Sequence, residues 1–253
     1  MIWDNLTTEQ IEKINKNLPV LILLCATEQH GPHLPLSTDR LIGEHFTHEL
    51  NRLIEDKFIL LPTVPIGCSD HHLDFVGTLT FKHSTFKKII REIVECMISH
   101  GFKNFLFLNS HGGNQGIGQV ILEILGNKFQ NCHFNLITWW KLANEELKNL
   151  NDSGPGGTGH AGEFETSLML FIAPKLVHKD KIIPSSDQKF DPLIGDMINP
   201  PSISYFQTIK KMSANGVVGN PNVSSIEKGE KISHIITSKL VDLVKNLNSI
   251  DKF

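Results

Sequence analysis

Cysteine and tyrosine are scarce in this sequence. Tyrosine occurs once in 253 residues, and the four cysteines include no CxxC pair. Each cysteine is far from the others along the chain and lies among apolar residues, as buried free thiols do. The sequence therefore predicts no disulfide framework, and a reducing cytoplasm is the location that it favours.

A charge excess and a long apolar run are also missing. The chain has 24 Lys and Arg against 27 Asp and Glu, a formal net charge of -3. This balance gives no basic field for phosphates, which argues against nucleic-acid binding and against a polybasic membrane anchor. No apolar run approaches the ~20 residues of a membrane span, and the N-terminus lacks the pattern of a signal peptide. We expect partners that are small molecules or other copies of the chain.

Histidine, by contrast, is abundant, with 13 residues. A chain of this length can bury about 70–75% of the surface that its unfolded state exposes, so it needs no structural metal in order to fold. The histidines therefore call for an explanation other than stability.

Apolar strands and amphipathic helices alternate along the chain. Unbroken apolar runs at residues 19–26, 58–61 and 105–108 predict strands covered on both faces. A fourth strand is predicted at residues 133–138. Helical periodicity predicts helices at residues 41–54, 86–99, 120–124 and 225–247, and Thr7 with Gln10 predicts a capping box. The pattern indicates an α/β fold with a mostly parallel sheet between helices, in a single domain over residues 1–253.

Two segments have little periodicity. Residues 151–159 are rich in Gly and Ser and contain Pro155, which predicts a loop that acts as a flap. Residues 184–222 contain five prolines, and we expect them to cover the site or to build an interface.

Candidate metal ligands follow three of the predicted strands. Ligands of open α/β sheets bind beyond the carboxyl ends of the strands. The polar residues at these ends are Glu28, His30, His33 and Asp39, then Asp70, His71, His72 and Asp74, and last Asn109 and His111. A lone histidine is more often a surface or core residue, but recurrence at successive strand ends favours metal binding. Imidazole with carboxylate suits zinc, manganese, iron or cobalt, and Asp39 is the candidate bridge of a two-metal centre.

A fourth cluster follows the predicted flap. His160 and Glu163 are spaced i,i+3 and can share one side of a helix, whereas Glu163 and Glu165 would point about 200° apart. Both glutamates could instead be favourable charges in a first helical turn. The preceding flap favours a functional role.

Three of these segments resemble the defining motifs of the creatininase family. They are residues 28–39 (EQHGPHLPLSTD), 109–114 (NSHGGN) and 160–167 (HAGEFETS). Residues 72–78 and 216–221 also resemble family segments, so the likeness covers nearly the whole chain. Val76 stands where the family usually has proline.

The resemblance implies a three-layer α/β/α fold, often assembled as hexamers, and a centre of two divalent metal ions, which would be zinc, manganese or iron. It implies hydrolysis of C–N bonds in small cyclic amides, formamides or peptides. Carried over by position, Glu28, Asp39 and His111 would bind one metal, and His30 with Asp39 the second.

The second metal needs a further carboxylate. Creatininase takes it from a glutamate two residues after the histidine of the middle motif, where this chain has Gly113. The resemblance implies Glu163 as the replacement and aligns His160 and Glu165 with proton-transfer residues. In the expected mechanism Glu163 or Glu165 takes a proton from water, and His160 protonates the leaving nitrogen.

The substrate is left open by the sequence. Creatininase closes its site with a tryptophan in the flap, which is absent here, so creatinine is not assumed. Trp139 and Trp140 are either a wall of the site or core residues, and only one of them is expected to point to the site. A peptidase acting on a cofactor precursor, a non-catalytic binding protein, and a mononuclear zinc enzyme using Glu28, His30 and His111 are the alternatives.

Overall fold

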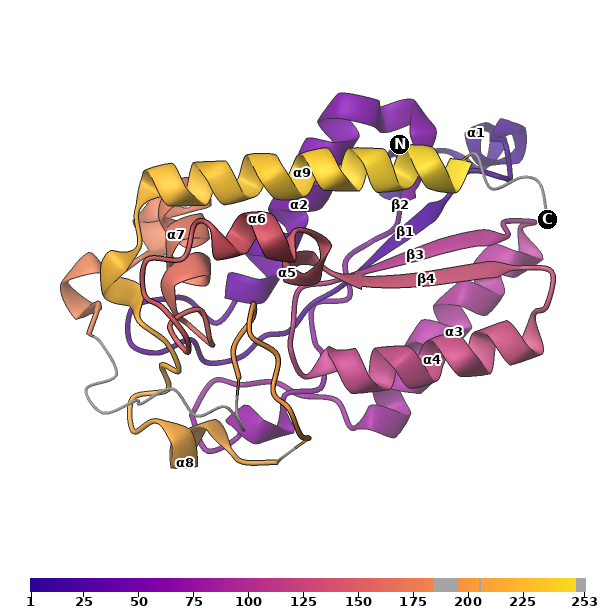
Figure 1. Ribbon diagram of the computed structural model, residues 1–253. Helices are drawn as coiled ribbons and strands as arrows, with labels where there is room; N and C mark the ends of the chain where they lie inside the picture. Colours follow the sequence, from indigo (N-terminus) through magenta and orange to yellow (C-terminus); the bar gives the residue numbers. More distant parts are fainter. Residues whose placement is uncertain (184–194, 205, 249–253) are drawn as a thin grey trace.

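The fold is built on a parallel sheet. The computed structural model describes residues 1–183, 195–204 and 206–248. Its four strands lie in the order β2-β1-β3-β4, with every pairing parallel (Figure 1). The strands are β1 (Val20–Leu24), β2 (Ile59–Leu60), β3 (Asn104–Asn109) and β4 (His133–Thr138). All four predicted strands are confirmed, with small shifts at their ends.

Helices cover both faces of this sheet (Figure 1). One face carries α2 (Thr38–Ile54), α5 (Trp139–Leu142), α6 (Asn144–Lys148), α7 (Glu163–Ile172) and α9 (Ile226–Asn248). The other face carries α3 (His83–Ser99) and α4 (Asn114–Lys128). Along β1, Leu21 and Leu23 pack in the first core, whereas Val20 and Ile22 pack in the second. This alternation explains the unbroken apolar run and confirms the three-layer α/β/α prediction.

The shorter elements connect these layers. They are α1 (Thr8–Lys13), α8 (Ile209–Met212), and the 3-10 turns η1 (Trp3–Asn5), η2 (Glu55–Lys57), η3 (Asp70–His72), η4 (Pro174–Leu176), η5 (Lys179–Lys181) and η6 (Pro221–Val223). The capping box of α1 is confirmed, since Gln10 N donates to Thr7 Oγ1 and Thr7 N donates to Gln10 Oε1. No helix in the described part of the chain combines the length and the apolar character that crossing a bilayer requires.

Some boundaries differ from the predicted ones, two of them for the same reason. The helices α2 and α3 begin three residues earlier than predicted, because their polar first turns carry no apolar periodicity. Trp139 and Trp140 open α5 instead of extending a strand. The irregular segment 184–222 includes α8 and η6, while its residues 184–194 and 205 lie outside the described residues.

Candidate metal centre

The carboxyl ends of β1 and β3 bring the candidate ligands together. Glu28 and His30 follow β1, His111 follows β3, and neighbouring parallel strands end at the same edge of the sheet. Asp39 comes from the first turn of α2. All four side chains are buried, with no more than 2% exposure.

Asp39 lies between two imidazoles. Its Oδ1 is 3.1 Å from His30 Nε2, and its Oδ2 is 3.1 Å from His111 Nδ1. Glu28 Oε1 is 3.2 Å from the same His111 nitrogen. One carboxylate thus presents an oxygen to each of two histidines, which is the arrangement of a bridging ligand.

Hydrogen bonds on the outer side of each ring orient the nitrogens that face the cluster. His30 Nδ1 lies 3.1 Å from the carbonyl oxygen of Glu28, and His111 Nε2 lies 3.0 Å from that of Cys68. A carbonyl oxygen can only accept, so each of these nitrogens carries the hydrogen and donates it. In the neutral rings the other nitrogen of His30 and of His111 therefore presents a lone pair to the carboxylates, as metal-binding histidines do.

This arrangement fits a bound cation. Among the described residues, Glu28 Oε2 and Asp39 Oδ2 are buried and accept no hydrogen bond. Asp39 Oδ2 faces the lone pair of His111 Nδ1 at 3.1 Å. Two lone pairs at this separation repel each other unless a proton or a metal ion lies between them.

The pKa values describe the cluster without metal. Burial raises the pKa of Glu28. Burial works against protonation of His30 and His111, but the carboxylates of Asp39, Glu28 and Glu165 outweigh it and raise the pKa of both rings. Without metal, these side chains therefore tend to hold protons at the positions where cations would bind. Metal binding should release these protons.

Glu165 and His160 lie on the His30 side of the cluster. Glu165 Oε2 is 3.8 Å from His30 Nε2 and accepts a hydrogen bond from Ala161 N. The rings of His160 and His30 have centroids 4.2 Å apart, and His160 Nε2 donates to the carbonyl oxygen of Gln29. One ligand atom each of His30, His160 and Glu165 lies within 4.8 Å of the others. Burial, then the nearby His30, lowers the pKa of His160 well below its usual value, so this ring is neutral.

Glu163 lies outside the cluster. It is the first residue of α7, and its carboxylate accepts hydrogen bonds from the backbone N–H groups of Asp152 and Ser153 and pairs with Lys228 of α9. The predictions that Glu163 completes the second metal site or acts as a catalytic base gain no support from this geometry, because its oxygens are already engaged. His160 precedes α7, so it does not share a helical side with Glu163. The predicted divergence of Glu163 from Glu165 explains why only Glu165 reaches the histidines.

Glu163 instead anchors the flap, which gives a test of stability. Replacing Glu163 with alanine leaves the buried Lys228 with the exposed Asp152 as its charged partner and the carbonyl oxygen of Val223 as a neutral one, so we expect a loss of about 3 kcal/mol in unfolding free energy. Urea unfolding of the metal-free protein measures this loss. The exposed Glu230 on α9 is a matched control, and Glu230→Ala should stay within about 0.5 kcal/mol of wild type. Loss of bound metal in Glu163→Ala but not in Lys228→Met would instead return Glu163 to the ligands.

The remaining histidines of the motifs have different surroundings. His33 Nε2 contacts Thr166 Oγ1 at 2.9 Å, and burial lowers the pKa of His33 to about 4, so it is a neutral brace for α7. His72 Nε2 lies 3.3 Å from Glu28 Oε1. His71 stacks on His111 and lines the pocket, and burial lowers its pKa to about 4. Asp70 and Asp74, which the sequence placed beside these histidines, are exposed.

Two asparagines brace the turn after β3. Asn109 Nδ2 donates to the carbonyl oxygen of His111, and Asn114 bonds Cys68 N and the carbonyl oxygen of Cys25. A Cβ on Gly113 would lie 2.2 Å from Cys68 O and 2.4 Å from His111 Nε2. The position where creatininase is expected to hold a glutamate therefore has no room for a side chain in this chain.

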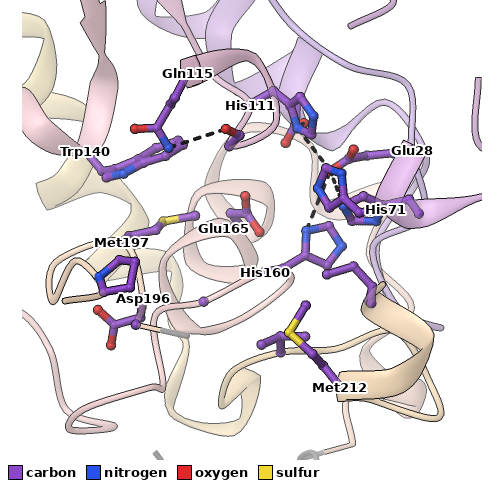
Figure 2. Close-up of a pocket in the computed structure, with 18 residues that line it drawn as sticks. Glu28, His71, His111, Gln115, Trp140, His160, Glu165, Asp196, Met197 and Met212 are labelled. Carbon is purple, nitrogen blue, oxygen red and sulfur yellow. Dashed lines mark hydrogen bonds and ion pairs between the residues drawn. The ribbon is translucent and has the colours of Figure 1, made fainter. Parts of the chain in front are cut away.

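A pocket of about 300 Å³ opens onto this cluster (Figure 2). Glu28, His71, His111, His160 and Glu165 border one part of it, and Trp140, Met197 and Met212 border another. Trp139 is buried in the core, so only Trp140 faces the pocket, as expected of the pair. Asp196 also lines the pocket and accepts a hydrogen bond from Gly156 N, which ties the described end of segment 184–222 to the flap.

Comparison with known proteins gives the site a context. A family model described as Creatininase, creatinine amidohydrolase, matches residues 4–244. A mycofactocin precursor peptide peptidase from Mycobacterium tuberculosis is 24% identical over 221 residues, which cover 84% of this chain and 79% of the relative. The creatinine amidohydrolase of Pseudomonas putida is 23% identical over 234 residues, which cover 87% and 86%.

Solved structures agree in fold. Two creatininase structures, one a variant described as the Zn–Zn type and one described as the Mn form, each superpose with a TM-score of 0.77. Each is 22% identical, and each comparison covers 97% of both chains.

Proposed function

Because this chain belongs to the creatininase family of hydrolases, we propose that it cleaves the C–N bond of a small amide, lactam or formamide with two divalent metal ions. The observation that carries the proposal is Asp39, whose two oxygens each lie 3.1 Å from a different histidine. A buried carboxylate placed in this way suits two cations better than one.

The contacts support two ligand sets. Glu28, Asp39 and His111 would hold one ion, and His30 with Asp39 would hold the second. Glu165 takes the place that the sequence had given to Glu163, because its Oε2 lies 3.8 Å from His30 Nε2.

The donor set suits zinc, manganese, iron or cobalt, of which the family likeness favours the first three. Every proposed ligand is an imidazole or a carboxylate, which suits these ions. Cys25 and Cys68 are close in the sequence to residues of the metal cluster. Burial raises the pKa of both thiols, that of Cys68 to about 11, so neither offers a thiolate. The zinc and manganese forms of creatininase are consistent with this choice.

The mechanism assigns proton transfer to His160. Bound cations would supply a water with a pKa lowered to about 7 and a polarised carbonyl. His160 Nε2–H donates to the carbonyl oxygen of Gln29, so Nδ1, the nitrogen that faces Glu28, is the atom at which this ring would take a proton. The same ring can then protonate the leaving nitrogen, so that one residue acts first as base and then as acid.

A second candidate function is peptide trimming. It is favoured by the mycofactocin precursor peptide peptidase, which aligns over 84% of this chain. The pocket of about 300 Å³ favours a small molecule, although the terminal residue of a peptide would also enter it. In the described part of the chain, two buried carboxylate oxygens of Glu28 and Asp39 have no hydrogen-bond donor, which favours cation binding over a protein that has lost its metal site.

The substrate class is tested by a panel. Purified protein loaded with zinc or manganese should cleave at least one member of a set of lactams (creatinine included), formamides and short peptides. Cleavage of peptides alone would favour the second candidate. Full metal loading with no turnover of any compound would favour the non-catalytic reading.

Metal removal should abolish this activity. Dialysis against a strong chelator is expected to remove activity completely, and zinc or manganese should restore it, since every proposed step needs the ions. Calcium serves as the control, because it prefers six to eight oxygen ligands and should not restore activity. Activity that survives verified metal removal would contradict the proposal.

The broader organisation rests on the sequence and the family likeness. We propose a single domain over residues 1–253 that works in the cytoplasm as a homo-oligomer, with a hexamer as the state that the family favours. Light scattering of the purified protein would test the assembly.

A further inference from the structure

Gln29 separates the two proposed ligands Glu28 and His30 in the sequence, and its side chain is held on both sides. Its Oε1 accepts a hydrogen bond from Gly31 N at 2.9 Å, and its Nε2 donates to the carbonyl oxygen of Gly216 at 3.3 Å. Gly216 has a φ of +87°, and a Cβ there would lie 2.0 Å from Gln29 Oε1. The amide is therefore fixed with its oxygen toward Gly31 and its nitrogen toward Gly216.

This orientation determines the hydrogen position on His72. Gln29 Nε2 lies 2.9 Å from His72 Nδ1, and an amide nitrogen can only donate. His72 Nδ1 must then accept, so the hydrogen of the neutral ring is on Nε2. That nitrogen lies 3.3 Å from Glu28 Oε1, to which it donates. Because Nδ1 accepts a hydrogen bond, the ring carries a single hydrogen and is neutral.

We propose that Gln29 and His72 are positioning residues that hold Glu28 as a metal ligand, with Gln29 fixing the His72 tautomer that donates from Nε2. The inference rests on the proposed function. The hydrogen bonds run from Gln29 Nε2 through the His72 ring to Glu28 Oε1. They leave Glu28 Oε2 without a donor among the described residues. Groups of this kind raise metal affinity by orienting a ligand that would otherwise rotate.

The same contacts exclude His72 as a ligand. One atom each of Glu28, His72 and His160 lies within 4.8 Å of the others, which alone would suit a metal. Both nitrogens of His72 are engaged, however, one as acceptor and one as donor, so the ring has no lone pair for a cation. Gln29 Nε2 also lies 3.1 Å from His160 Nε2, but that nitrogen donates to the carbonyl oxygen of Gln29.

The experiment measures zinc affinity by competition with a chromophoric chelator. His72→Phe removes both hydrogen bonds and should weaken zinc binding about 10- to 100-fold. His72→Gln places an amide N–H near the former Nε2 and should restore affinity to within a few-fold of wild type. Gln29→Met, of similar volume, should weaken binding as His72→Phe does. The exposed residues Gln130 and His133 provide matched controls, Gln130→Met and His133→Gln, which should bind as wild type.

The tautomer provides a readout that a merely structural role would not move. Long-range ¹H–¹⁵N spectra of histidine-labelled protein should show His72 protonated at Nε2, with or without zinc. In Gln29→Glu the new carboxylate would accept from Nδ1, and the hydrogen should move to that nitrogen.

The outcomes separate the two proposals. Wild-type protein that binds no zinc would overturn the proposed function. Wild-type protein that binds zinc, together with unchanged affinity in His72→Phe or a His72 hydrogen on Nδ1, would overturn this inference alone.

Discussion

Replacing Asp39 with alanine should remove nearly all bound metal and nearly all activity. Within the described residues, Asp39 is the one carboxylate that faces both His30 and His111 at 3.1 Å, so its loss opens both proposed sites at once. Residues that merely orient a ligand are worth about 10- to 100-fold in metal affinity, and a shared ligand should exceed that range. Metal content by mass spectrometry and kcat/KM on the substrate found in the panel measure the effect.

The control for Asp39 is an aspartate outside the cluster. Asp74 follows η3 and is exposed, so Asp74→Ala should keep its metal. Near-normal activity of Asp39→Ala with one ion bound would contradict a bridging role and favour the mononuclear alternative with Glu28, His30 and His111.

Replacing His160 with alanine should lower kcat about 10²- to 10⁴-fold while two ions stay bound. His160 is neutral, and its Nδ1 lies 3.7 Å from Glu28 Oε1, at the border of the pocket. The proposed proton transfer would be lost, but the main ligands would be untouched. Steady-state kinetics, with metal content measured on the same sample, separate the two effects.

The exposed His48 on α2 provides the comparison, and His48→Ala should keep the wild-type kcat. An unchanged kcat in His160→Ala would remove His160 from proton transfer. Loss of one ion in this variant would instead make His160 a ligand beside His30 and Glu165, whose atoms lie within 4.8 Å of it.

Local patterns were enough to predict the layers of the fold. Burial on both faces of β1 and β3 requires unbroken apolar runs, and such runs are visible in a single sequence. The capping box at Thr7 was also predictable, because its two partners are three residues apart. The first residues of the helices were less predictable. The first turn of α2 carries Asp39, which belongs to the site and not to the core, so this turn shows no apolar periodicity.

The site was predictable where the sheet topology brings strand ends together. The strand ends pointed to Glu28, His30 and His111, because parallel strands bring their carboxyl ends together. The roles of Glu163 and Glu165 depend on where α7 begins and on Lys228, which is 65 residues beyond Glu163. Nothing near Glu163 in the sequence indicates that partner.

Gln29 shows a second limit. An amide between two candidate ligands carries no signal of its own, and its role depends on His72 and Gly216, far away in the chain. The sequence predicted that one of Trp139 and Trp140 points to the site, but not which one, because that depends on how α5 packs.

The most direct test of the two-metal claim is a titration of metal-free protein with zinc or manganese, followed by activity and by the amount of ion bound. Activity should rise until two equivalents per chain are bound and then stay constant. A plateau of full activity at one equivalent per chain would contradict the two-metal claim.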